Sequence, residues 1–186
     1  MNMLKVANGS MLALTTLVCL GQFVFWYDKL PAVVPSHFDG TGQANGWMSK
    51  FGFYLLMGSL QALLLVGTPM LGRLIKNLPD SMLNIPNKDY WLAPERREGT
   101  LDLNSCFLGT VGWLTSWLFI AIFHISALVA TEQQASVNPQ LYWAIGIYVV
   151  TLFLATTRLL WRFRFPAGER GDRITNLADT DNFANR

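Results

Sequence analysis

The chain has 186 residues, of which 52% are hydrophobic and only 14% are charged. A soluble domain usually carries about a quarter charged residues, so this deficit, together with 12 Phe and 7 Trp, indicates a membrane protein. The formal net charge of +2 is too small to imply a nucleic-acid partner, and we expect none. The two cysteines show no CxxC or Cys/His spacing, so free thiols are expected.

Four apolar runs are long enough to cross a bilayer, whose hydrocarbon core takes about 20 helical residues. None of them alternates with a period of two, which favours helices over a β-barrel. The predicted spans are residues 6–27, 51–71, 106–130 and 141–161. The first span should be an uncleaved helix, because no Ala-x-Ala cleavage site follows it. The predicted fold class is therefore all-α, a polytopic membrane protein with four transmembrane helices.

The positions of lysine and arginine predict the orientation, because cytoplasmic loops carry an excess of positive charge. The connection 72–105 holds five such residues, the segment after the last span holds another five, and the connection 131–140 holds none. We therefore expect both termini and the connection 72–105 in the cytoplasm, with the loops 28–50 and 131–140 outside. Residues 1–165 form the transmembrane domain, and Arg158 is expected to reach the inner headgroups.

The cytoplasmic connection divides into two parts. Residues 77–89 contain two prolines and are expected to be irregular. Proline is favoured in the first turn of a helix, so Pro94 to about Asp102 is predicted to be a short interfacial helix that runs into the third span. Tyr90 and Trp91 are expected to anchor it at the headgroups. The tail 166–186 is polar and should be flexible by composition, unless a partner subunit holds it.

A metal site or acid/base pair at the outer face is one alternative. The predicted topology puts His37, Asp39, His124 and Glu132 on the same side, and these side chains can ligate metals or transfer protons. However, no HExxH or other i, i+4 ligand spacing is present, so we favour a loop-ordering role for His37 and a helix-bonding role for His124. GxSxG, P-loop and GxGxxG patterns are also absent from the sequence, and we expect no enzyme, no cofactor and no metal.

The outer loop 28–50 is the most distinctive stretch, and from Leu30 it reads LPAVVPSHFDGTGQANGWMSK. Its prolines restrict the backbone and its glycines permit turns. Five of its side chains are too apolar for a free loop, so we expect them to fold back on the outer helix ends: Val33, Val34, Phe38, Trp47 and Met48. His37 and Asp39 would then face solvent or a partner. The loop is thus predicted to be a structured cap.

A family resemblance rests on the motif residues Pro31, Pro35, His37, Phe38, Asp39, Gly42, Trp47 and Lys50. This pattern resembles a bacterial membrane domain of unknown function, which also forms the N-terminal part of the Sdp-type toxin-immunity proteins (the SdpI family). The resemblance covers roughly residues 12–65. It implies a small helical protein of the bacterial inner membrane, and in the best-studied members it implies immunity to a secreted peptide toxin.

These observations lead to three hypotheses about function. We expect a non-enzymatic inner-membrane protein that binds a ligand or partner, such as a peptide, through the outer loop. The alternative is an accessory subunit packed against a larger membrane protein complex. A metal-dependent enzyme at the outer face ranks third. Membrane lipid is a further expected partner of all three.

Overall fold

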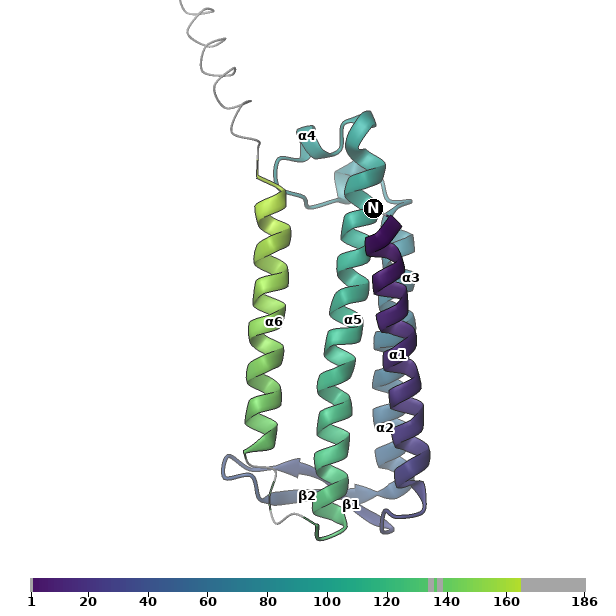
Figure 1. Ribbon diagram of the computed structural model, residues 1–186, viewed down its shortest axis with the longest axis vertical. Helices are drawn as coiled ribbons and strands as arrows, with labels where there is room; N and C mark the ends of the chain where they lie inside the picture. Colours follow the sequence, from purple (N-terminus) through teal and green to yellow (C-terminus); the bar gives the residue numbers. More distant parts are fainter. Residues whose placement is uncertain (1, 134–135, 137–138, 165–186) are drawn as a thin grey trace, which may run out of the picture.

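The computed structural model describes residues 2–133, 136 and 139–164. Four long helical rods lie side by side, and a small hairpin crosses one end of them (Figure 1). Each rod is long and apolar enough to cross a membrane, which makes this a multi-pass membrane protein. The rods are Asn2–Tyr27 (α1), Lys50–Ile75 (α2, η1 and α3), Pro94–Ala130 (α5) and Gln140–Arg162 (α6). The predicted tail 166–186 and part of the loop 131–140 lie outside the described residues.

The second rod contains a change of helix type. It consists of α2 (Lys50–Ala62), a π-helical turn η1 (Leu63–Gly67) and α3 (Thr68–Ile75). A proline inside a helix lacks an N–H and crowds the carbonyl one turn earlier. Pro69 lies in the first turn of α3, two residues after the π turn, and the wider turn gives its ring room while the rod continues to Ile75.

Helix α5 is the central element and contacts α1, α3, α6 and β1. Its 37 residues correspond to about 55 Å at 1.5 Å per residue, well beyond the roughly 30 Å hydrocarbon core. The predicted interfacial helix, Pro94 to Asp102, is therefore the first part of α5 itself, and it projects past the apolar span.

The main core lies where α1, α2 and α5 meet the hairpin. Its buried side chains are Trp26, Leu30, Val34, Phe53, Met57, Phe123 and Ala127. Phe53 stacks on Phe123 with ring centroids 5.0 Å apart, and Phe23 lies 4.9 Å from the same ring. Aromatic packing thus joins three helices directly beneath the strands.

Close packing between α5 and α3 depends on a glycine. A Cβ added at Gly112 would lie 2.0 Å from the Thr68 hydroxyl oxygen and 2.7 Å from the Leu64 carbonyl oxygen. Small residues permit this kind of approach between membrane helices. The absence of a side chain at Gly112 therefore sets the distance between the two rods.

At the other end, the connection contains a 3-10 turn η2 (Asp80–Met82) and a short helix α4 (Lys88–Trp91). Trp91 Nε1 and Asn87 Nδ2 donate hydrogen bonds of 2.9 and 2.8 Å to the carbonyl oxygen of Phe163. Phe163 is buried, and its ring packs edge-on against Trp91. Trp91 therefore fastens the end of α6 to the connection, a role in addition to the predicted headgroup anchor.

Helix α6 has the loosest packing of the four rods. None of its described residues from Gln140 to Arg162 is buried. The hydroxyl groups of Tyr148 on α6 and Thr115 on α5 form a hydrogen bond of 3.1 Å. The start of α1 and the end of α6 lie at the end opposite the hairpin (Figure 1). The two ends of the bundle are thus divided as the predicted topology requires, with the start of α1 and the end of α6 on one side and the hairpin on the other. Which side is inside the cell stays a prediction.

Candidate functional site

The outer loop forms a β-hairpin, an element that the all-α prediction did not include. β1 (Val33–Phe38) pairs antiparallel with β2 (Ala44–Ser49). The loop is structured, as predicted, but its Pro, Asn and Gly residues are poor strand formers and pointed away from strands. The register pairs Pro35 with Trp47, and it shifts between Pro35 and His37.

The two faces of the hairpin differ in exposure. Val34 is fully buried and Met48 packs against the main core, so their predicted folding back onto the helix ends is confirmed. Val33 and Trp47 are 55% and 59% exposed, and for them the same prediction is wrong. Successive strand residues point to opposite faces, so a hairpin that buries Val34 must turn Val33 outward. Phe38 is half-buried.

Asp39 organises the hairpin tip. Its Oδ1 accepts hydrogen bonds from Thr41 Oγ1 at 2.6 Å, from Thr41 N at 2.8 Å and from Gln43 N at 3.1 Å. The Thr41 hydroxyl, followed by the backbone N–H groups, holds the pKa of the Asp39 carboxyl below its usual value. Gly42 completes the turn with a φ of 82°, where glycine has no steric penalty. Asp39 therefore has a structural role in the tip.

His37 lies on the outward face and is exposed. Its Nδ1 lies 2.5 Å from Asn45 Oδ1 on the opposite strand. An amide oxygen only accepts, so the contact is a hydrogen bond in the tautomer that carries the proton on Nδ1. The pair orders the loop, as predicted for His37, and it presents a polar group beside Trp47.

Lys50 joins the two ends of the motif. Its Nζ donates to the carbonyl oxygen of Tyr27, the last residue of α1, at 3.0 Å and to that of Leu30, in the turn that follows, at 3.1 Å. Lysine near a helix C terminus can satisfy carbonyls that lack an intrahelical partner. Lys50 N also donates to Ala32 O, and Ser49 Oγ caps α2 through Gly52 N. Lys50 therefore ties the start of α2 to the end of α1.

The remaining motif residues and the tip complete the frame. Pro35 is buried, whereas Pro31 is exposed. Tyr142 of α6 donates a hydrogen bond of 2.8 Å to Gly40 O at the tip. The hairpin is thus held by α1 and α2 at its base and by α6 at its tip, and Figure 1 shows it lying across the helix ends.

The four residues of the alternative metal site are used separately. His124 Nδ1 accepts a hydrogen bond of 3.3 Å from Trp26 Nε1, which confirms its helix-bonding role. Asp39 is committed to the tip and His37 to Asn45, while Glu132 has a φ of 58° just past the end of α5. Within the described residues, no group of three His, Cys, Asp or Glu side chains could hold a metal. That part of the chain does not assemble the alternative site.

An ionic cluster around a buried carboxylate at the opposite end was missed by the sequence reasoning. Asp102 of α5 contacts Lys5 of α1, 2.5 Å from Nζ to Oδ2, and it also contacts Lys76 at the end of α3. Only 8% of the Asp102 side chain is exposed. Its one sequence indication is an acid between Leu101 and Leu103 at the edge of an apolar run. The cluster holds three rods together at this end.

Comparison with known proteins gives one partial match. Residues 14–61 match the model of a domain of unknown function, DUF1648. The match covers well under half of the chain, and it includes about half of α1, the whole hairpin and most of α2. No curated protein and no solved structure matches the chain. The predicted resemblance to a membrane domain of unknown function is thereby supported, while the link to Sdp-type immunity proteins stays a prediction.

Proposed function

We propose that this multi-pass membrane protein is a non-enzymatic binding protein of the bacterial inner membrane, which captures a peptide or protein segment outside the membrane. The contact surface is the outward hairpin face, defined as Val33, His37, Asn45 and Trp47. This proposal keeps the Sdp-type hypothesis of peptide recognition and assigns it to one face of the hairpin.

The single observation that carries the proposal is the exposure of Trp47 on a strand that is otherwise well fastened. Tryptophan is enriched among the residues that dominate binding energy at interfaces. Trp47 is 59% exposed and Val33 is 55% exposed, next to the polar His37–Asn45 pair. This combination of an apolar surface and a fixed polar group suits a peptide, which has both kinds of group to satisfy.

The anchoring of the hairpin favours binding energetically. Association costs free energy when a mobile segment must be ordered, and a preformed segment avoids that cost. The buried Val34, the Lys50 bonds to α1 and the Tyr142 bond to Gly40 hold the hairpin in place before any partner arrives. The competing explanation is that Trp47 anchors the hairpin in lipid headgroups, where tryptophan is also favoured.

Site-specific photocrosslinking in cells separates these explanations. A photoreactive amino acid would replace Trp47 in one variant and Trp143 in the other. Trp143 is a matched control because it is 71% exposed near the same end of the bundle but lies on α6. We expect a discrete peptide or protein adduct at position 47 and none at position 143. Lipid adducts alone at both positions would refute the proposal.

A growth assay tests the peptide-immunity form of the proposal. The deletion strain would be challenged with secreted peptide toxins and complemented with the wild type, Trp47→Ser, His37→Ala or Trp143→Ser at matched membrane levels. We expect only the two hairpin variants to fail. Full complementation by Trp47→Ser, or a deletion strain no more sensitive than its parent, would count against immunity.

The accessory-subunit alternative is favoured by one observation, the wholly unburied helix α6. A photoreactive group at Phe153, which is 67% exposed, would report a partner packed on that helix. A membrane-protein adduct there, with only lipid at position 47, would replace the binding proposal with the subunit function. The third hypothesis, a metal-dependent enzyme, fails if neither the wild type nor His37→Ala contains bound metal.

A further inference from the structure

A groove with two arginines lies between α1, α5 and α6, at the end of the bundle opposite the hairpin. Its volume is about 230 Å³, and its apolar lining includes Leu4 of α1, Phe107 of α5 and Ala155 of α6. Arg158 and Arg162 of α6 line the same groove. A second groove along α6, with Leu154 and Trp161, shares both arginines.

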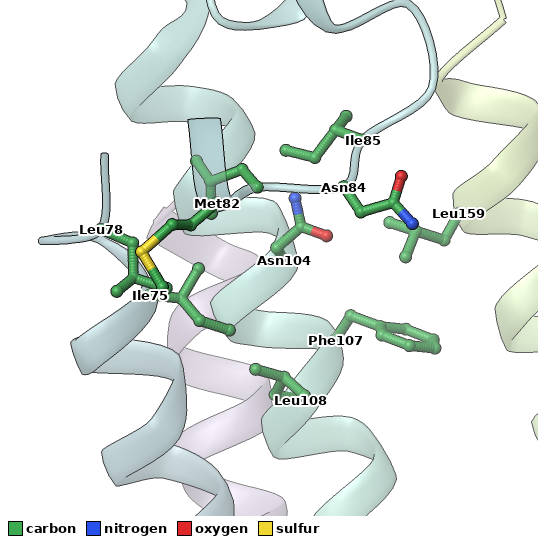
Figure 2. A pocket seen from close by; sticks show the side chains of 10 residues that line it. Ile75, Leu78, Met82, Asn84, Ile85, Asn104, Phe107, Leu108 and Leu159 are labelled. Atoms are coloured by element: carbon green, nitrogen blue, oxygen red, sulfur yellow. The ribbon is translucent and has the colours of Figure 1, made fainter. Parts of the chain in front are cut away.

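The neighbouring groove provides a contrast within the same protein. Figure 2 shows it between α5 and the connection that precedes it, and Phe107 and Leu159 line both grooves. Its polar side chains are the amides of Asn84 and Asn104, and its described lining includes no charged residue. The two arginines therefore line the groove between α1, α5 and α6, whereas the groove in Figure 2 has an uncharged described lining.

The two arginines have no ion-pair partner in the described part of the chain. None of the three ion pairs found there involves Arg158 or Arg162, and the carboxylate of Asp102 on α5 is already shared by Lys5 and Lys76. Residues four apart on a helix lie side by side, and like charges at this spacing repel each other. An anion bound between the guanidinium groups would remove this repulsion.

The depth of the arginines matches the lipid interface. Four residues along a helix correspond to about 6 Å, so Arg158 lies about that much deeper than Arg162. Trp161 is 69% exposed beside them, and tryptophan marks the headgroup level of membrane helices. Basic pockets between transmembrane helices on the cytoplasmic side are suited to anionic headgroups.

We infer that this groove is a binding site for one anionic phospholipid of the inner leaflet. Arg158 and Arg162 hold the phosphate, and an acyl chain lies along Leu4, Phe107 and Ala155. Arginine suits this role because its planar guanidinium can bind a phosphate through two parallel hydrogen bonds. The lipid also fills the space beside α6, which packs mainly against α5.

Native mass spectrometry of the full chain tests this inference. The protein would be equilibrated with equal amounts of phosphatidylglycerol and phosphatidylcholine carrying identical acyl chains, and the lipid retained after gentle detergent removal would be counted. We expect the wild type to retain one phosphatidylglycerol in preference. Each arginine should contribute about fivefold to the preference, so Arg158→Gln/Arg162→Gln should nearly abolish it.

Two further variants separate a specific groove from general surface charge. Arg73→Gln/Lys88→Gln removes the same charge from the same end but touches neither arginine, and it should keep the wild-type preference. Ala155→Phe keeps both arginines but fills the groove, and it should lower the preference. Equal retention of the two lipids by the wild type, an unchanged preference in Ala155→Phe, or displacement of the lipid by millimolar inorganic phosphate would overturn the inference.

Discussion

Replacing Gly112 with alanine tests whether this glycine sets the distance between α5 and α3. The new Cβ would lie 2.0 Å from Thr68 Oγ1, whereas ordinary contacts begin near 3.4 Å. Thr68 could rotate away only by losing its hydrogen bond of 2.6 Å to Leu64 O. The Leu64 carbonyl oxygen, 2.7 Å from the new atom, belongs to the backbone and cannot rotate away. The helices must therefore move apart.

The expected magnitude follows from two opposing terms. Alanine is a better helix former than glycine by about 1 kcal/mol. Adding a carbon to a tightly packed interface costs about 1–3 kcal/mol. Gly146 on α6 is the matched control, because a Cβ there meets no described atom within 4 Å. The helix-propensity term cancels between the two variants, so Gly112→Ala should be less stable than Gly146→Ala by about 1–3 kcal/mol.

The assay is reversible unfolding in mixed micelles, followed by tryptophan fluorescence, with the free energy of unfolding compared among the variants. Thr68→Ala/Gly112→Ala should recover only part of the loss, since the Leu64 carbonyl still blocks the new carbon. The reasoning is refuted if Gly112→Ala is as stable as Gly146→Ala, because the two rods would then have room for a methyl group.

Three other changes address the remaining contacts. Lys50→Met removes two charged hydrogen bonds, to the carbonyl oxygens of Tyr27 and Leu30. It should lower the free energy of unfolding by about 1–3 kcal/mol and increase amide exchange at the end of α1. Unchanged amide exchange would show that Lys50 does not stabilise the end of α1. The Asp39 pKa is lowered by folding, so its stabilisation of the tip is complete at neutral pH and is lost as the pH falls through the folded-state pKa. Amide protection at Thr41 and Gln43 should fall in acid in the wild type and be weak at every pH in Asp39→Ala, and pH-independent wild-type protection would contradict this. Asp102→Asn leaves Lys5 and Lys76 without their shared carboxylate, and it should lower the free energy of unfolding by about 2 kcal/mol in the same assay. An unchanged free energy of unfolding would rule out a stabilising role for the Asp102 cluster.

Local composition was sufficient to predict the four spans. The predicted last span, 141–161, differs by one residue at each end from α6, Gln140–Arg162. Pro94 correctly marked the start of the helix that leads into the third span. These features depend only on the length of apolar helix that a bilayer demands, together with proline at the first helical position, so they could be read without knowing any partner.

The hairpin illustrates where such reasoning stops. Its composition indicated a folded cap, and one face of it does pack on the bundle. Which residues face inward depends on the pairing register, and a change of one residue exchanges the two faces. Val33 and Val34 are chemically alike, yet only Val34 is buried. Lys50 likewise acts on carbonyl groups at positions 27 and 30, which only the folded chain brings within reach.

What the sequence determined by itself was the number of membrane-crossing rods and the segments that join them. Tertiary structure alone decided which rods are in contact, which glycine packs against a neighbouring helix and which charged side chains form ion pairs. Asp102, Lys5 and Lys76 come from three separate segments and form one cluster. In a membrane the lipid is as apolar as the helices, so hydrophobicity does not distinguish a packed face from a lipid-facing one. The choice of partners rests on shape and on a few polar contacts, and these exist only once the helices are side by side.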